Sequence, residues 1–172
     1  MNRTIALAAT GAALAFGLTA CGGSTPSAAP ATPGSAVAAS QSAVSPAASV
    51  IATQFTHAGL GVTHIITYTE ATDPNHLMGR QGGYTSKVAW TDPAAITAGA
   101  QAAQGGSVTG GGIEVFPTAA EAQARYAKLK GFTAPIGDGY DYLAGTAVLR
   151  LSQYLTPAQA AAFKAAFTKA AS

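Results

Sequence analysis

Charged side chains are scarce in this chain, and lysine, arginine, aspartate and glutamate make up only 9% of its 172 residues. Of these, only Arg3 lies before position 51, and residues 51–172 carry eight basic and seven acidic side chains. A domain with a net charge of +1 has no electrostatic footprint for phosphate, so charge argues against a nucleic-acid partner. The composition also excludes a collagen, a coiled coil and a multi-domain enzyme.

Cysteine is nearly absent as well, because Cys21 is the only one in the sequence. A single cysteine cannot form a disulfide within the chain. A domain without disulfides must be held together by its hydrophobic core, and ~120 residues are enough to build one.

The N-terminus has the pattern of a targeting segment. Met1-Asn2-Arg3 is a short positive region, and residues 5–18 follow without a charge and are rich in alanine, leucine and phenylalanine. That apolar run is shorter than the ~20 residues that span a bilayer, and its length is typical of a signal peptide. We expect residues 1–20 to be a cleaved leader.

The end of this leader, Leu18-Thr19-Ala20-Cys21, resembles the lipobox of bacterial lipoproteins, here of actinobacterial type. The resemblance implies cleavage before Cys21 and a thioether-linked diacylglycerol on its sulfur, with acyl chains such as palmitate. Two acyl chains anchor a protein stably where one does not. The expected location is therefore the extracytoplasmic side of the cell membrane; the alternative is an ordinary secreted protein with an incidental cysteine.

A tether is expected to follow over residues 21–45. Residues 22–50 contain 9 Ala, 7 Ser, 4 Pro, 3 Gly and 2 Thr, and no aromatic or charged side chain. Such a stretch cannot bury enough apolar surface to offset ordering, so we expect a disordered spacer. As a flexible coil it spans roughly 30 Å. O-glycosylation of its serines and threonines is an open alternative to a plain spacer.

Residues 46–172 have the pattern of one folded domain. A first helix is predicted to start at Ser45-Pro46, with serine as N-cap, and to end at Gly59. Runs of β-branched and aromatic residues predict strands, two capping boxes predict later helices, and residues 93–106 are a loop or short helix. The expected strands are 62–69, 85–91, 107–116 and 142–152, and the capping boxes are Thr118-Ala119-Ala120-Glu121 and Thr156-Pro157-Ala158-Gln159.

The resulting element order is α-β-β-β-α-β-α. Loops, and not crossover helices, join the first three strands, which favours antiparallel pairing. We therefore predict an α+β fold with a mostly antiparallel four-stranded sheet and about three helices packed on one face.

Motifs for catalysis, metals or cofactors are missing from the pattern. His57, His64 and His76 do not stand at the spacing that brings two metal ligands together. The glycine-rich run at 105–112 lacks the Gly-Lys-Ser/Thr ending of a phosphate loop and leads into a strand. No Gly-x-Ser-x-Gly elbow is present. The sequence thus predicts no catalytic residue, no metal and no cofactor.

The most distinctive segment runs from Asp73-Pro74-Asn75 through Leu77-Met78-Gly79-Arg80 to Tyr84-Thr85-Ser86-Lys87. It resembles a pattern of small, uncharacterised bacterial lipoproteins, which implies no activity. One interpretation is an ordered polar loop fixed to the sheet, in which Arg80 pairs with Asp92 or Glu70. The other is a loop that contacts a ligand or partner, in which Arg80 and Lys87 meet an anionic group and Tyr84 stacks on it. The candidate site residues are Asp73, Asn75, Arg80, Tyr84 and Lys87.

Three functions are compatible with these patterns. The first is a lipid-anchored, non-enzymatic binding or interaction module at the cell envelope, whose partner is a cell-wall component or another envelope protein. The second is a small envelope hydrolase or metal-dependent enzyme, which requires the three histidines to converge or one of them to meet a carboxylate in a cleft. The third is an inhibitor or immunity-type protein, which requires an exposed aromatic patch near Tyr140 and Tyr142.

Overall fold

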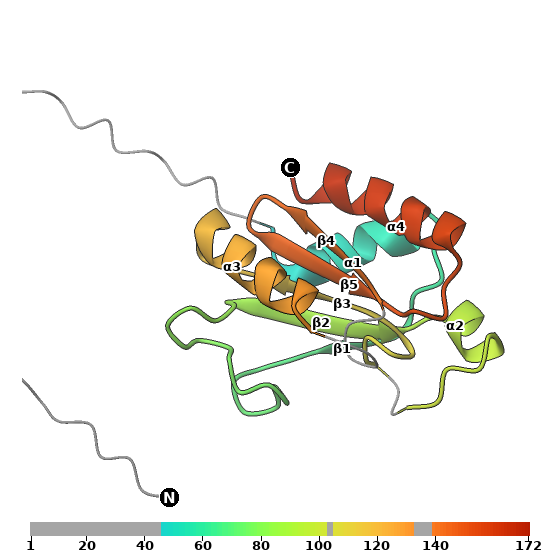
Figure 1. Cartoon of the computed structure of the whole chain (residues 1–172), viewed down its shortest axis with the longest axis horizontal. Coiled ribbons are helices and arrows are strands. Elements are labelled where there is room, and N and C mark those ends of the chain that lie inside the picture. Colours follow the sequence, from blue (N-terminus) through green and yellow to red (C-terminus); the bar gives the residue numbers. More distant parts are fainter. Residues whose placement is uncertain (1–45, 103–104, 133–138) are drawn as a thin grey trace, which may run out of the picture. The chain divides into compact units, whose positions relative to one another are not determined.

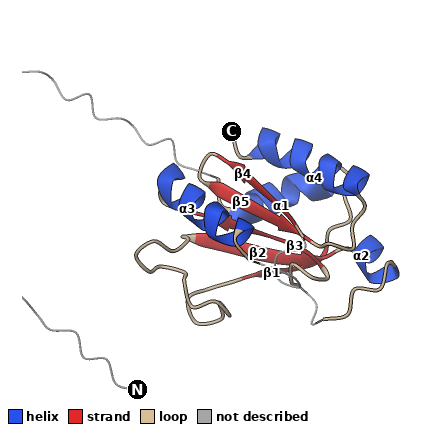
Figure 2. Ribbon diagram, viewed as in Figure 1, coloured by secondary structure: helices blue, strands red, loops and turns tan. Residues whose placement is uncertain are grey.

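The computed structural model describes residues 46–102, 105–132 and 139–172. The expected leader, Cys21 and tether fall outside these residues. The described part contains five strands and four helices in an α+β arrangement (Figures 1 and 2). In chain order they are α1 (Ala48–His57), β1 (Thr63–Thr67), β2 (Ser86–Thr91), α2 (Pro93–Thr97), β3 (Gly110–Val115), α3 (Ala119–Lys130), β4 (Tyr140–Ala144), β5 (Ala147–Leu151) and α4 (Pro157–Ala170).

The strands form one antiparallel sheet in the order β1-β2-β3-β5-β4. The α+β class and the antiparallel pairing are confirmed, but the prediction of four strands is wrong. The stretch expected as one strand over 142–152 is the β4–β5 hairpin, in which Ala144 pairs with Ala147. Gly145 turns the chain with a φ of 54°, a left-handed conformation that glycine adopts without steric cost.

Helices cover both faces of the sheet, so the expectation that they share one face is also wrong (Figure 1). On β5, Leu149 packs into the core beneath α1 and α4, whereas its neighbour Val148 packs into a second cluster beneath α3. Side chains of consecutive strand residues point to opposite faces. A strand with apolar residues at both positions is thus buried on both sides, which requires a helix on each.

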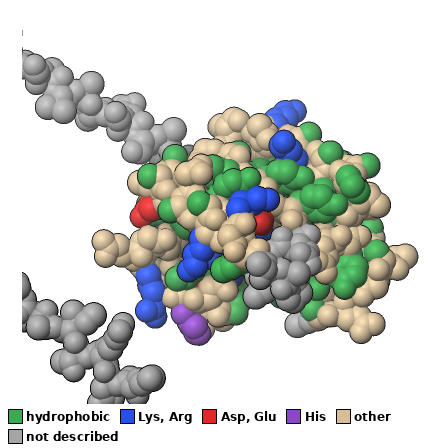
Figure 3. All heavy atoms as spheres, in the orientation of Figure 1, with side chains coloured by type: hydrophobic (Ala, Val, Ile, Leu, Met, Phe, Trp, Pro, Cys, Tyr) green, Lys and Arg blue, Asp and Glu red, His purple; other side chains and the backbone are tan. Residues whose placement is uncertain are grey.

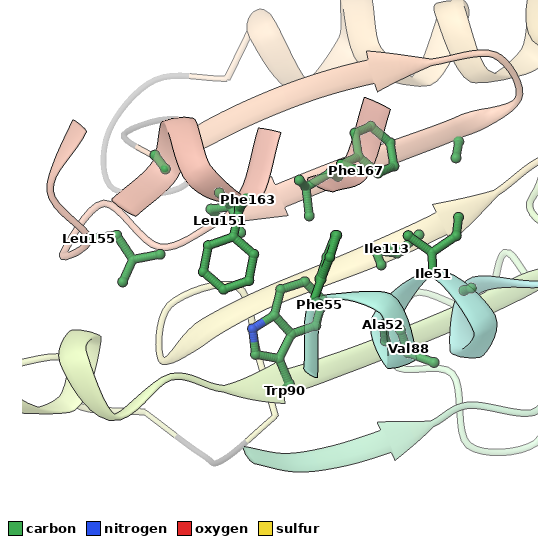
Figure 4. Packing of buried hydrophobic residues seen from close by; sticks show 14 of the residues in the cluster. Ile51, Ala52, Phe55, Val88, Trp90, Ile113, Leu151, Leu155, Phe163 and Phe167 are labelled. Atoms are coloured by element: carbon green, nitrogen blue, oxygen red, sulfur yellow. The ribbon is translucent and has the colours of Figure 1, made fainter. Parts of the chain in front are cut away.

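The larger core lies between the sheet and the pair α1 and α4 (Figure 4). Phe55 of α1 packs edge-on against Trp90 of β2 and Phe163 of α4, with ring centroids 5.6 and 5.3 Å apart. Trp90 and Phe163 stack at 5.8 Å. This cluster joins residues far apart in the sequence and fixes both helices to the same face of the sheet.

The N-termini of α3 and α4 lie where the two capping boxes predicted them. At α4, Thr156 accepts the Gln159 amide and the Gln159 side chain accepts the Thr156 amide, which is the expected capping box. At α3, Thr118 accepts the Glu121 amide, but the Glu121 carboxylate binds the Thr118 hydroxyl and not its amide.

The first helix departs further from the prediction, because it begins at Ala48 and its N-cap Ala47 offers no side-chain acceptor. The Ala48 amide instead donates to the Ser86 hydroxyl on β2 at 3.0 Å. No helix among the described residues has the length and apolar character needed to cross a membrane.

Candidate functional site: a polar pocket on the α3 face

The strand register places charged residues side by side on the face that carries α3. Lys87 of β2 pairs with Glu114 of β3. Two residues further along β2, on the same face of the sheet, Ala89 pairs with Gly112. Gly112 in turn pairs with Arg150 of β5, which pairs with Asp141 of β4. Figure 3 shows side chains of both signs lying together near the middle of this face. The sheet thus holds an organised polar surface beside the apolar cluster under α3.

The first ion pair joins the loop after β1 to the sheet. Lys87 Nζ donates to Asp73 Oδ1 at 2.8 Å, and the Asp73 side chain is fully buried. The hydroxyl of Tyr84 also donates to Asp73, at 2.6 and 2.7 Å to its two oxygens. The backbone amides of Asn75, Leu77 and Met78 complete the shell around this carboxylate. Asp73 therefore fixes the loop to the sheet.

Ionisation of Asp73 is favoured by these donors. Burial alone would raise the pKa of Asp73, but the hydrogen bonds from Lys87, Tyr84 and the backbone amides outweigh it and hold the pKa well below its usual range. The hydrogen bond between the two side chains acts in the opposite direction on the tyrosine, whereas burial raises the pKa of both groups. Burial first, and then donation to Asp73, raises the pKa of Tyr84 well above its usual range. Asp73 is thus a fixed negative charge and Tyr84 a neutral donor at neutral pH.

A second pair lies on the neighbouring strand and is bidentate. Arg125 of α3 donates from Nε to Glu114 Oε2 at 2.7 Å and from Nη2 to Oε1 at 2.9 Å. Asn75 donates to the same Oε1 at 3.4 Å. Burial would lower the pKa of Arg125, but the bond to Glu114 raises it overall. This geometry is the strongest that an arginine and a carboxylate adopt, and it locks α3 over the sheet.

A third pair connects the two strands of the hairpin. Arg150 Nε donates to Asp141 Oδ1 at 3.1 Å, and Asp141 is buried. These six described side chains therefore form three ion pairs on the α3 face.

A pocket of about 170 Å³ opens among these groups, and we call it the sheet pocket. Its floor includes Ala89 and Gly112, which are direct partners on adjacent central strands and leave the space that larger side chains would fill. Its polar wall includes Lys87, Glu114, Arg150, Asn75 and Ser107, and Tyr68 adds an aromatic side. The Lys87 ammonium lies 4.8 Å from the centre of the Tyr68 ring, a cation–π distance.

The structure brings together four of the five residues predicted as a site, because the Tyr84 hydroxyl donates to Asp73 and accepts from Lys87. Lys87 and Asn75 line the sheet pocket, and Asp73 holds Lys87 in place from behind. Arg80 is exposed and forms no ion pair within the described part of the chain, so the predicted pairing with Asp92 or Glu70 is wrong. Asp92 instead accepts the Ala94 amide as the N-cap of α2.

Tyr84 has a different role from the one predicted for a ligand contact. Its side chain is fully buried and packs edge-on against Phe116, with ring centroids 5.8 Å apart. It cannot stack on an external molecule. Asp73 fixes the loop to the sheet, as the first interpretation expects, but without the predicted ion pair of Arg80.

Sequence reasoning missed Glu114, Arg125, Asp141 and Arg150. A signal for two of them was present, because Glu114 and Arg150 stand alone inside runs that are otherwise apolar or glycine-rich. A charge in a strand that is buried on both faces needs a partner. The partners themselves come from α3 and β4, and only the folded chain identifies them.

The alternative sites gain no geometric support in the described residues. His57, His64 and His76 are all exposed, and no group of three or more potential metal ligands forms in the part of the chain that the structure describes. Tyr140 and Tyr142 are half-buried and pack against the main core, and Tyr140 donates to the Leu155 carbonyl. They do not form an exposed aromatic patch.

Comparison of the chain with family models, with curated proteins and with solved structures gives no match in any of the three.

Proposed function

We propose that this chain is a lipid-anchored lipoprotein on the extracytoplasmic side of the cell membrane, and that it acts as a non-enzymatic binding module at the cell envelope. In this proposal Cys21 carries the lipid and residues 21–45 form the tether. The sheet pocket is the ligand site. Its ligand is a cell-wall component or a group displayed by another envelope protein.

The observation that carries the binding proposal is the preorganised pocket. Lys87 and Glu114 are each held by partners outside the pocket, Asp73 and Arg125, so their positions are fixed before a ligand arrives. Polar groups that are already fixed around a pocket lose less conformational entropy when a ligand binds, so binding has a smaller entropic cost to offset. The small floor at Ala89 and Gly112 provides the hollow itself.

Binding without catalysis is favoured by the state of the polar groups. The charged side chains that line the pocket are engaged in ion pairs, and the three histidines are exposed and absent from the residues that line it. A general base needs a free lone pair within reach of a bound substrate. The described pocket is therefore better suited to hold a molecule than to transform it.

The anchor is tested by intact mass and membrane fractionation of the wild type and Cys21→Ser in a Gram-positive host. The proposal predicts a diacylglyceryl mass and membrane association for the wild type, both lost in the variant. Two equally soluble, unlipidated proteins would contradict it.

The binding site is tested by a ligand-observed NMR screen of small polar fragments against the Cys21→Ser chain. The proposal predicts fragments whose binding is lost in the same chain with Gly112→Ala, because the added methyl group enters the pocket floor. Gln153→Ala, at an exposed position outside the pocket, is the matched control. A screen in which Gly112→Ala changes nothing would overturn the pocket assignment.

A further inference from the structure

The charged side chains described in the wall of the sheet pocket each have a partner of opposite charge, and this pairing restricts the ligand. Lys87, Glu114 and Arg150 line it, and their partners Asp73, Arg125 and Asp141 cancel their charges pair by pair. No excess of either sign results from these three pairs.

A ligand with a net charge would be at a disadvantage in such a site. It would lose hydration on entering a partly enclosed space, and the charges already present are satisfied by their own partners. A zwitterion would lose the hydration of two charged groups and would have to compete with two existing ion pairs. The arrangement therefore disfavours small anions, cations and amino acids.

Hydroxyl groups suit the pocket better, because each can donate and accept. Lys87 has three N–H donors, and two hydrogen bonds, to Asp73 and Tyr84, are formed with the described residues. Ser107 lines the pocket, and its hydroxyl forms no hydrogen bond with any described residue. Glu114 is a charged acceptor whose bonds to a hydroxyl would be stronger than those of a neutral group.

The volume of the pocket limits how large a part of a ligand it can enclose. A cavity of about 150 Å³ accommodates one benzene molecule, and the sheet pocket measures about 170 Å³. It therefore has room for the six-membered ring of one sugar, whose outer substituents would lie at the open side of the pocket. Tyr68, Pro74 and Ala89 supply apolar contacts for the carbon side of such a ring.

We infer that the sheet pocket binds an uncharged, polyhydroxylated ring, either a free monosaccharide or one sugar residue of a larger glycan. This inference rests on the proposed function of the pocket as a binding site. It adds the chemical class of the ligand.

The test is isothermal titration calorimetry of the Cys21→Ser chain with four probe sets. They are neutral sugars (glucose, galactose, mannose, N-acetylglucosamine), neutral trisaccharides of glucose and of N-acetylglucosamine, amino acids (alanine, glutamate), and inorganic phosphate. We expect at least one neutral sugar to bind with a dissociation constant on the order of millimolar, as is typical of a ligand of this size. Tighter binding of a trisaccharide would identify a glycan as the source, and equal binding a free sugar.

Two substitutions in the pocket, each added to the Cys21→Ser chain, make the result specific. Gly112→Ala fills the floor and Ser107→Ala removes the hydroxyl, and each should weaken sugar binding by roughly ten-fold or more, whereas Gln153→Ala should leave it unchanged. Gly112 has no positive φ, and a methyl group there would lie 3.1 Å from the Val88 carbonyl oxygen and at ordinary contact distance, 3.8 Å, from Ala89 Cβ, so this variant should fold. Ser107→Ala, which only removes an oxygen, provides a second variant.

The outcomes separate the two proposals. If only amino acids or phosphate bind, and Gly112→Ala abolishes that binding, the ligand class is wrong and the pocket stands. If no sugar binds while fragments still bind in the pocket, the ligand class is again wrong. If neither sugars nor fragments respond to Gly112→Ala, the proposed function itself fails.

Discussion

Lys87 and Asp73 form a buried ion pair of 2.8 Å between the second strand and the loop that follows the first. The lysine ammonium lies between the rings of Tyr68 and Tyr84, at 4.8 and 5.3 Å from their centres. The pair connects three features of the molecule. Asp73 orders the loop and binds Tyr84, which belongs to the cluster under α3, and Lys87 lines the sheet pocket.

Loss of one partner of this pair should destabilise the domain strongly. Lys87→Met leaves the buried Asp73 carboxylate without its counter-ion, and breaking a buried pair in this way costs about 3–5 kcal/mol. Urea unfolding followed by the fluorescence of Trp90, the only tryptophan in the chain, measures the loss. The double variant Lys87→Met/Asp73→Asn removes both charges, and its free energy of unfolding should fall clearly less than that of Lys87→Met. A loss below about 1 kcal/mol in Lys87→Met would show that the pair behaves like an exposed one.

The stability should also depend on pH through Asp73. Its pKa is lowered in the folded chain, so the unfolded chain binds a proton first as pH falls. The stabilisation is present above the ordinary aspartate pKa of about 3.9 and is lost progressively below it. Urea unfolding between about pH 5 and pH 2 should show a steep fall for the wild type and a shallower one for Asp73→Asn. Parallel curves for the two proteins would refute the role of Asp73.

Two helix caps with different origins should contribute similar free energies. Thr156→Ala removes a cap within the local sequence, and Ser86→Ala removes the hydroxyl that accepts the Ala48 amide from a distant strand. Each should lower the free energy of unfolding by about 1 kcal/mol. Gln153→Ala, at an exposed position, should be neutral in the same urea experiment. An unaffected Ser86→Ala protein would mean that the start of α1 needs no such acceptor.

Adjacent glycines on β3 should respond differently to alanine. A methyl group at Gly111 would lie 2.4 Å from the Trp90 ring and 2.8 Å from the Arg150 carbonyl, in the main core. At Gly112 it would point into the sheet pocket. Gly111→Ala should therefore lower the free energy of unfolding by about 1–3 kcal/mol through overpacking, and Gly112→Ala should lower it clearly less. Thermal unfolding of the two variants tests this, and equal losses would show that Gly112 has no space above it.

Much of the fold follows from local sequence patterns. The N-cap at Thr118 and the capping box at Thr156 mark the starts of α3 and α4, because a capping side chain acts on amides only three residues away. The second and third strands were also expected from their residue types. The β4–β5 hairpin was missed because Gly145 is its only glycine and no Asn-Gly or Asp-Gly pair marks the turn.

The candidate site was predicted only in part, and the reason is geometric. Asp73 and Asn75 have turn chemistry that the sequence displays, and Lys87 stands in a recognisable segment. The pairing of Glu114 with Arg125 and of Arg150 with Asp141 depends on strand register and on the placement of α3. Arg80 was expected to pair because of its charge, yet it lies exposed on a loop whose anchoring Asp73 already provides.

The most direct test of the central claim, that the sheet pocket is the binding site, is amide chemical-shift mapping. The full chain with Cys21→Ser, labelled with ¹⁵N, is titrated with the neutral sugars and with the fragments found in the screen. We expect shifts concentrated at Ala89, Ser107 and Gly112. Shifts confined to the more open groove of about 490 Å³ between α1 and α4, at residues such as Val50 and Ala166, would contradict it, as would the absence of any shift.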